Sequence, residues 1–362
     1  MMNRMLVCIV LLSLVLAGCA PSLKSKTIII PETGDSGSSP AANEAMELSA
    51  IYKLSENGNI LGWQSKDELL GTIWKTSRSR SLDRIDYKHN SYETWINLEG
   101  STEIQGLSPD GSFAVSSVQA DRKETMKLLR LTGSQPVEIG ELSTEAMRVS
   151  MLTWSNNSRY TAYSEQKTGQ AGRAIAVYDT AANKMKEYPI PDWNVLAVKI
   201  SNDGSSALLV RSSGRQYSLV YGKLDETGFA SLYEHDIAGD FGTFDFMNDD
   251  QVMLVGSSGA LIVFDRRNNT TSVVTEQIGS FRLSPDRKMI VYSRGRDSLY
   301  VAKVQGNSLL NEKEVYKGIV PFQLEWSPDN KKIVLNGNKA YEPRPVASAQ
   351  VVVTDPLILE LK

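Results

Sequence analysis

Short runs of alternating apolar and polar residues, separated by Gly, Asn and Asp, fill most of the chain and predict half-buried β-strands joined by tight turns. Val, Ile, Tyr and Phe are frequent in these runs, as expected of strands. One stretch predicts four strands in succession: Met151–Ser155, Tyr160–Ser164, Ala174–Asp179 and Lys184–Tyr188. The same plan returns at Phe244–Phe246, Gln251–Val255, Ala260–Asp265 and Thr270–Thr275. We therefore predict an all-β fold made of repeated four-stranded units.

A short phrase marks the start of each unit. It is clearest as Leu107-Ser108-Pro109-Asp110-Gly111. The apolar residue that opens each copy, called its anchor below, recurs at steps of 37 to 47 residues: Trp63, Leu107, Trp154, Ile200, Phe246, Leu283 and Trp326. Four short strands with their turns occupy that length, which is one blade of a β-propeller. We predict seven blades; the short step after Phe246 and the degenerate copies at Trp63 and Phe246 leave six or eight open.

The phrase itself predicts a tight turn. Pro fixes the backbone of the first turn residue, Asp hydrogen-bonds its own backbone, and Gly accepts a positive φ. Because Asp110, Asp286 and Asp329 occupy equivalent turns, we interpret them as turn-forming residues and not as catalytic acids.

The repeat resembles a known family. The phrase with its following strand resembles the TolB-type Pro-Asp propeller repeat, which is WD40-like, from about Asn59 to Leu361. It is degenerate at Gln64-Ser65-Lys66-Asp67 and at Met247-Asn248-Asp249-Asp250. The layout of the chain also resembles the YqgU-like propeller lipoproteins of Gram-positive bacteria. These resemblances imply a β-propeller, and the second implies export and lipid anchoring.

How the ring closes stays open between two alternatives. The last blade receives Phe322–Trp326, Lys332–Leu335 and Gln350–Thr354 as its first three strands. Its outer strand is either Leu357–Leu361 or the N-terminal Ile51–Leu54. Asn57-Gly58, between two apolar runs, is a hairpin signal and competes with the N-terminal alternative.

The first residues predict an export signal. Arg4 precedes the apolar run Leu6–Leu16, which is too short to span a bilayer as a helix. Leu16-Ala17-Gly18-Cys19 resembles the lipobox of bacterial lipoproteins, which implies cleavage before Cys19 and a diacylglycerol on its sulfur. An ordinary signal peptide with a chance Cys is the alternative.

These features divide the chain into a lipoprotein signal peptide (1–18), a lipidated Cys with a flexible tether rich in Gly, Ser and Pro (19–50), and a propeller domain (51–362). The lipid would hold the protein at the outer face of a bacterial cell membrane, Gram-positive by resemblance.

The formal net charge of −3 lacks the basic excess of nucleic-acid binders, so we expect no nucleic-acid partner. The other cysteine, Cys8, lies in the signal, so we expect no disulfide.

Residues typical of catalytic or metal sites are scarce. His89 and His235 lie in different predicted blades and without metal-ligand spacing, so we expect neither a metal site nor a cofactor. The sequence contains no Gly-x-Ser-x-Gly nucleophile elbow and no phosphate-binding Gly-rich loop.

A weak concentration of cations lies in the loops between the second and third strands. Seven of them form the candidate ligand face: Lys75, Arg78, Arg80, Arg211, Arg215, Arg294 and Arg296; Arg122 and Lys123 belong to the same kind of loop. Such a face would attract an anionic envelope polymer or phospholipid headgroups. The alternative is ordinary loop charge, since Asp121, Glu124 and Asp297 dilute the effect.

Together these patterns favour a non-catalytic, lipid-anchored propeller that binds a protein or a cell-envelope ligand through one face or the central funnel. One alternative is a propeller enzyme, of the lyase, lactonase or hydrolase type, that uses Asp and Arg in the central channel. Another is a purely architectural component of the envelope.

Overall fold

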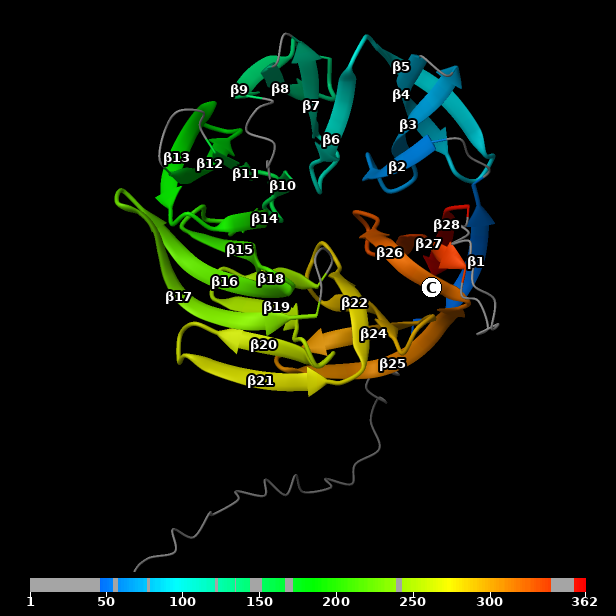
Figure 1. The fold of residues 1–362 in the computed structure, drawn as a ribbon. Coiled ribbons are helices and arrows are strands. Elements are labelled where there is room, and N and C mark those ends of the chain that lie inside the picture. The colour runs from blue at the N-terminus through cyan, green and yellow to red at the C-terminus, as the bar shows by residue number, and fades with distance from the viewer. Residues whose placement is uncertain are drawn as a thin grey trace, which may run out of the picture. The chain divides into compact units, whose positions relative to one another are not determined.

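The fold is seen in a computed structural model that describes residues 46–54, 58–76, 79–120, 123–133, 135–143, 152–166, 172–238, 243–339 and 355–362. These residues belong to one compact unit, Asn43–Lys362. They form 28 strands and no helix, and the strands build seven four-stranded antiparallel sheets. Figure 1 shows the sheets arranged as blades around a common axis. The all-β propeller is confirmed, with seven blades rather than six or eight.

Each blade runs outward from the channel. The innermost strands are β2 (Gly58–Trp63), β6 (Thr102–Leu107), β10 (Thr153–Trp154), β14 (Asn194–Ile200), β18 (Phe244–Asn248), β22 (Ile278–Leu283) and β26 (Ile319–Trp326). The second strands are β3 (Leu69–Thr76), β7 (Phe113–Ala120), β11 (Tyr160–Gln166), β15 (Ser206–Ser213), β19 (Gln251–Val255), β23 (Met289–Arg294) and β27 (Lys332–Lys339).

The two remaining positions complete the blades. The third strands are β4 (Ser79–Asp86), β8 (Lys123–Arg130), β12 (Arg173–Asp179), β16 (Gln216–Asp225), β20 (Leu261–Asp265), β24 (Ser298–Gln305) and β28 (Leu357–Leu361). The outer strands are β5 (Ser91–Leu98), β9 (Val137–Ser143), β13 (Lys184–Ile190), β17 (Gly228–Ile237), β21 (Thr270–Thr275), β25 (Ser308–Lys317) and β1 (Leu48–Lys53).

The two ends of the described chain meet in blade seven, whose strand order is β1-β28-β27-β26. Leu357–Leu361 pairs with β27 and is the third strand, so its prediction as the outer strand is wrong. The N-terminal alternative is confirmed, because β1 pairs with β28 at the outer position. Leu48–Ala50, predicted above to be tether, also belongs to this strand.

Two other expectations about closure are settled differently. A hairpin at Asn57-Gly58 is wrong, because β1 and β2 belong to different sheets. Gln350–Thr354, predicted as the third strand of blade seven, lies outside the described residues, and β28 takes that position beside β27.

Apolar side chains are buried between the blades. Among the described residues there are seven hydrophobic clusters, one between each pair of neighbouring blades. The cluster between blades seven and one contains Leu54, Ile60 and Val334, so apolar packing also joins the first and last blades. Each anchor is the last residue of its inner strand, except Phe246, which lies within β18.

The recurring turns join the first strand of a blade to the second. In blade six the Ser284 hydroxyl donates to Asp286 Oδ1 at 2.7 Å and accepts from the Met289 N–H at 2.9 Å. Equivalent Ser-to-carboxylate or amide bonds occur at Ser108–Asp110, Ser155–Asn157, Ser201–Asp203 and Ser327–Asp329. The fourth turn residue has a positive φ in all five: Gly111, Ser158, Gly204, Arg287 and Asn330. The turn-forming role predicted for these Asp residues agrees with this geometry.

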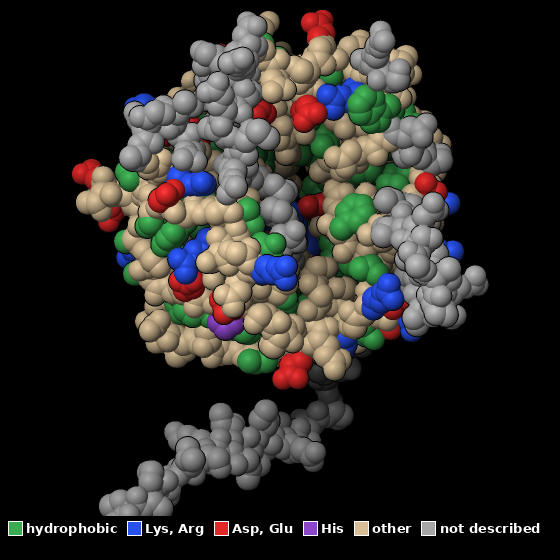
Figure 2. Space-filling view, in the orientation of Figure 1, with side chains coloured by type: hydrophobic (Ala, Val, Ile, Leu, Met, Phe, Trp, Pro, Cys, Tyr) green, Lys and Arg blue, Asp and Glu red, His purple; other side chains and the backbone are tan. Residues whose placement is uncertain are grey.

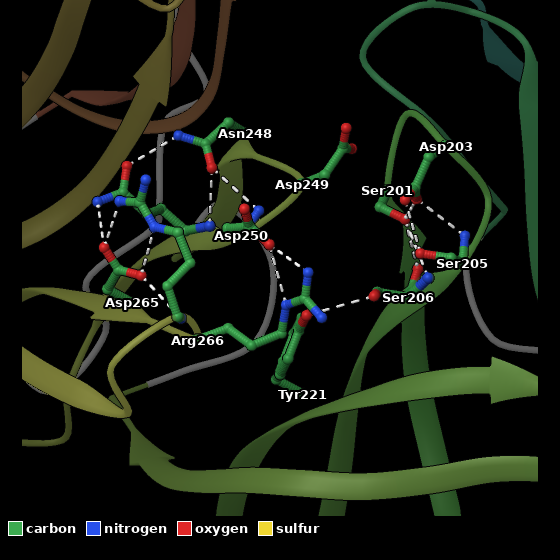
Figure 3. A network of polar contacts seen from close by, with 12 residues as sticks. Ser201, Asp203, Ser205, Ser206, Tyr221, Asn248, Asp249, Asp250, Asp265 and Arg266 are labelled. Atoms are coloured by element: carbon green, nitrogen blue, oxygen red, sulfur yellow. Dashed lines mark hydrogen bonds and ion pairs between the residues drawn. The ribbon is translucent and has the colours of Figure 1, made fainter.

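The end of the propeller that carries these turns, called the turn face below, is also tied together from blade to blade. The Asn157 N–H donates to Asn202 Oδ1 and the Asn202 N–H to Asp249 Oδ1, both at 2.9 Å. Figure 3 shows the part between blades four and five, where Arg266 pairs with Asp250 and the Tyr221 hydroxyl donates to Ser206 at 3.2 Å. The opposite end, with the loops between second and third strands, is called the loop face.

Candidate functional site

One position on every inner strand lies beside the channel. It is the residue immediately before the anchor, occupied from blade one to blade seven by Gly62, Gly106, Thr153, Lys199, Asp245, Arg282 and Glu325. Side chains alternate along a strand, so this residue points to the opposite side from the buried anchor and toward the next blade. The position is small in blades one to three and charged in blades four to seven. At this position, one side of the ring therefore carries charged side chains and the other side carries small, uncharged ones.

The charged side forms a chain of ion pairs. Lys199 Nζ lies 2.6 Å from Asp245 Oδ1, and Arg287 lies 2.7 Å from Asp245 Oδ2. Arg282 donates two hydrogen bonds to Glu325, at 2.6 and 3.2 Å. We call these five residues the channel cluster. They come from four consecutive blades and meet only because the inner strands converge on the axis (Figure 1).

Burial divides the channel cluster in two. The Asp245 side chain is 3% exposed and Lys199 is 11% exposed, so this pair is removed from solvent. Arg282 and Glu325 keep 34% and 30% of their side-chain surface exposed, although they lie on innermost strands. A charged group at the centre of the ring that stays accessible to this extent faces a channel open to solvent. Figure 2, drawn in the same orientation, shows a hollow at the middle of the ring.

The ionisation states follow from these contacts. Burial, partly opposed by the Asp245 charge, lowers the pKa of Lys199 to about 8. Burial alone would raise the pKa of Asp245, but the charges of Arg287, Lys199 and Arg282 outweigh it and hold that pKa well below its usual range. The Glu325 carboxylate raises the pKa of Arg282. At neutral pH the channel cluster thus holds three cations and two carboxylates.

Arg287 reaches the channel from an unusual backbone position. It is the fourth residue of the blade-six turn, with φ of 62°, where blades two and four have Gly111 and Gly204. A side chain in this left-handed region costs about 1–2 kcal/mol. The guanidinium offsets this cost by pairing with the buried carboxylate of Asp245 on the preceding blade.

At the turn face, turns of two blades that are not neighbours in the ring are joined by a hydrogen bond. The Asn156 side-chain amide donates to the Phe246 carbonyl at 3.1 Å, although these residues belong to blades three and five. The channel cluster lies directly beside these turns, one residue before the anchors. The channel cluster is thus nearer to the turn face than to the loop face.

Closer to the loop face, Phe322 lies on the same inner strand as Glu325. The register between β26 and β27 shifts between Pro321 and Gln323, so Phe322 is the extra residue of a β-bulge, and it is 57% exposed. Bulges redirect side chains and are common beside functional sites. Gln323 donates to the Ile60 carbonyl at 3.0 Å, which fixes this strand to blade one.

The cations predicted as a ligand face are dispersed over three blades and mostly paired. Lys75 pairs with the buried Asp83 at 2.5 Å, and Arg294 pairs with Glu312, also at 2.5 Å. Arg80 lies 3.4 Å from Glu103.

Arg211 pairs with Glu234 and lies over the Trp193 ring, 5.0 Å from its centroid. Arg215 and Arg296 are exposed, and Arg78 lies outside the described residues. Pairing with carboxylates offsets most of the positive charge that the loop sequences indicate.

The two histidines do not lie together. His89 is 78% exposed and its Nδ1 lies 2.7 Å from Asp86, while the ring of His235 stacks on Tyr233. Within the described ranges, no three His, Cys, Asp or Glu side chains are grouped as metal ligands would be. Cys19, the predicted lipidation site, lies outside the described residues. No helix of the described part is long and apolar enough to cross a membrane.

Sequence reasoning missed the channel cluster, although a signal for it exists. Aligning the seven anchors and comparing the preceding residue gives the series from Gly62 to Glu325 directly. That series changes from small to charged residues halfway round the ring, whereas the anchors and turns stay alike.

Comparisons with known proteins add little to this picture. No protein-family model and no curated protein matches the chain. A solved structure of a functionally unknown protein from Desulfotomaculum acetoxidans DSM 771 is similar, with 12% identity and a TM-score of 0.47, over 83% of this chain and 100% of that one. The TolB-type and YqgU-like resemblances stay predictions from the repeat.

Proposed function

We propose that this protein is an exported lipoprotein whose propeller is a non-catalytic binding module, with its ligand site in the central channel. Lipid on Cys19 would hold it at the outer face of a bacterial cell membrane, Gram-positive by resemblance. The membrane contact is then made by the lipid, and the ligand is a protein or a component of the cell envelope. Support for export and lipidation comes from Arg4, the apolar run after it and Leu16-Ala17-Gly18-Cys19.

The observation that best supports binding in the channel is the Arg282–Glu325 pair. Both charges are enclosed by the inner strands, yet each keeps about a third of its side-chain surface accessible. Arg282 uses its Nε and one terminal nitrogen on Glu325, so a guanidinium edge stays available to a ligand.

The rest of the channel cluster supports a non-catalytic role. Lys199 and Arg287 hold the two oxygens of Asp245, which keeps this carboxylate ionised and already paired. A carboxylate bound in this way neither donates a proton nor accepts one readily, so Asp245 supplies fixed charge and not acid–base chemistry.

A second candidate function is favoured by one observation. The pKa of Lys199, about 8, lies in the range of a general base, which fits the lyase, lactonase or hydrolase alternative. Incubating the protein with lactones, esters and acidic polysaccharides would test it. Turnover that Lys199→Met abolishes would establish the enzyme and overturn the non-catalytic proposal.

The lipid anchor has a direct test with an internal control. Cells expressing the protein are grown with an alkyne analogue of palmitate, and the label is detected on the purified chain. We expect Cys19→Ala to lose the label and to appear in the medium, and Cys8→Ala to stay labelled in the membrane. Equal labelling of wild type and Cys19→Ala would overturn the lipoprotein assignment.

The binding role is tested by purification of the lipidated protein from detergent extracts of the native cell. We expect one protein or envelope component to be retained reproducibly, and Arg282→Gln to retain less of it. Arg215→Gln is the matched control, because Arg215 is an exposed Arg on the loop face outside the channel cluster. If wild type and Arg282→Gln repeatedly retain the same components in the same amounts, the ligand site is not in the channel.

A further inference from the structure

We infer that the channel binds an organic anion, with its charged group at Arg282 and its apolar part against Phe322. This inference rests on the proposed function, since it names the class of ligand for the same channel. It follows from three features of the described residues: the net charge of the channel cluster, the uncharged residues at the equivalent position opposite it, and the exposed side chain of Phe322 on the same strand as Glu325.

The charge balance favours an anion. Lys199, Arg282 and Arg287 are each paired with Asp245 or Glu325, and three cations against two carboxylates leave the channel cluster with a net charge of +1. Opposite charges attract more strongly in an enclosed, poorly hydrated site than at an open surface. Arg282 is the accessible cation of the three, with 34% of its side chain exposed.

The opposite side of the channel carries no charged side chain at the equivalent position. Gly62 and Gly106 occupy the positions that are charged in blades four to seven. Gly62 has a φ of 149°, which side chains rarely adopt, so its backbone accounts for glycine there, whereas a Cβ at Gly106 would meet its nearest neighbour at 3.6 Å, an ordinary contact distance. Next to Gly106, the buried indole N–H of Trp154 has no acceptor among the described residues, whereas Trp63 and Trp326 donate to backbone carbonyls.

The apolar part of the ligand is indicated by Phe322. It is one of the few large apolar side chains of the described chain that are more than half exposed. It precedes Glu325 by three residues on β26, which places it about 10 Å nearer the loop face. A ligand that enters from the loop face would meet Phe322 first and Arg282 at the base. The combination suits a molecule with an anionic group at one end and an apolar body.

The test uses the full mature chain made without lipid through Cys19→Ala, and the fluorescent probe 8-anilinonaphthalene-1-sulfonate, an aromatic sulfonate. We expect saturable binding of one probe per chain. Arg282→Gln and Phe322→Ala should each weaken binding about tenfold, which corresponds to about 1.4 kcal/mol. Inorganic phosphate should compete with the probe. Arg215→Gln is the control and should bind as wild type does.

Glu325→Gln gives the sharpest outcome, because its effect has the opposite sign. Removing this carboxylate frees Arg282 and adds one unit of positive charge, so probe binding should tighten several-fold. A variant that merely disturbs the fold would weaken binding instead. If Arg282→Gln does not fold, Arg282→Gln/Glu325→Gln removes both partners and keeps the net charge; it should still bind weakly.

The result that overturns the inference is equal probe affinity in wild type, Arg282→Gln and Phe322→Ala, or weaker binding in a folded Glu325→Gln. Absence of saturable binding to wild type also overturns it. If the native-cell purification still retains a component in that case, the anion class is wrong and the binding role stands. If neither experiment gives binding to wild type, the proposed function fails as well.

Discussion

The turn face and the channel cluster lie next to each other, but the first repeats the same residues in most blades and the second does not. In the turns the same bonds return from blade to blade, as at Ser108–Asp110, Ser284–Asp286 and Ser327–Asp329. One residue away, at the position before each anchor, the residue type changes around the ring from Gly62 to Lys199 and beyond.

The difference separates architecture from candidate function. A feature needed to build every blade must be present in every blade, so repetition identifies structural residues. A position that is small in three blades and charged in four is not required by the blade. Its charges must also be paired across blades, as Asp245 is with Lys199 and Arg287, because an unpaired charge at that depth is destabilising.

The largest expected effect comes from removing the carboxylate at the centre of the channel cluster. Asp245→Asn keeps the shape but leaves Lys199 and Arg287 without a counter-charge in a buried site. Breaking a buried ion pair in this way costs about 3–5 kcal/mol. Urea denaturation followed by circular dichroism should therefore find a large drop in the free energy of unfolding. A loss below about 1 kcal/mol would mean that the cations relax into solvent and that the buried pairs are not part of the fold.

The next prediction compares the fourth turn residue of two blades: Arg287, which belongs to the channel cluster, and Asn330, which does not. Arg287→Gly relieves a left-handed side chain but removes the ion pair with Asp245, so we expect a net loss of about 2 kcal/mol. Asn330→Gly, at the same position of blade seven with φ of 59°, should stay within about 0.5 kcal/mol of wild type. Thermal unfolding of both variants gives the comparison. Equal effects would place Arg287 with the turn and not with the channel.

The fold could be predicted from the sequence because it depends on what repeats. Trp63, Ile200 and Trp326 are separated by regular steps, and each ends an inner strand. The strand that closes the ring could not be predicted, because Leu357–Leu361 and Ile51–Leu54 are both short apolar runs. Either of them fits the outer position of blade seven. Only the three-dimensional pairing of β1 with β28 decides between them.

The candidate site was harder to predict for a physical reason. Lys199 and Asp245 look like ordinary outward-facing residues of alternating strands, and nothing local indicates that they meet across two blades. The loop cations were overestimated for the same reason. Arg80, for example, lies against Glu103 of the next blade, which neutralises a charge that the loop sequence presents as free.

A smaller effect is expected from the turns themselves. The buried Ser284 hydroxyl bonds both Asp286 and the Met289 N–H, so Ser284→Ala should cost about 1–2 kcal/mol. Ser108→Ala and Ser327→Ala should cost similar amounts, because their turns make the same bonds. Urea denaturation measures all three, and probe binding should not change. A binding defect in Ser284→Ala alone would contradict the assignment of the turns to structure and of the channel cluster to binding.

The smallest effect is a pH dependence that the turn face cannot produce. The pKa of Lys199 is about 8 in the folded state and near 10.4 in an unfolded chain. Between these values the unfolded chain binds more protons, so this group makes the fold more stable as the pH rises. From pH 8 to 9 the contribution is about 1 kcal/mol. The measurement is the free energy of unfolding of wild type minus that of Lys199→Met at each pH, which cancels the titration of other groups. A difference that stays constant or falls over this range would contradict the lowered pKa. It would mean that Lys199 keeps its proton, because the attraction of Asp245 outweighs the effect of burial.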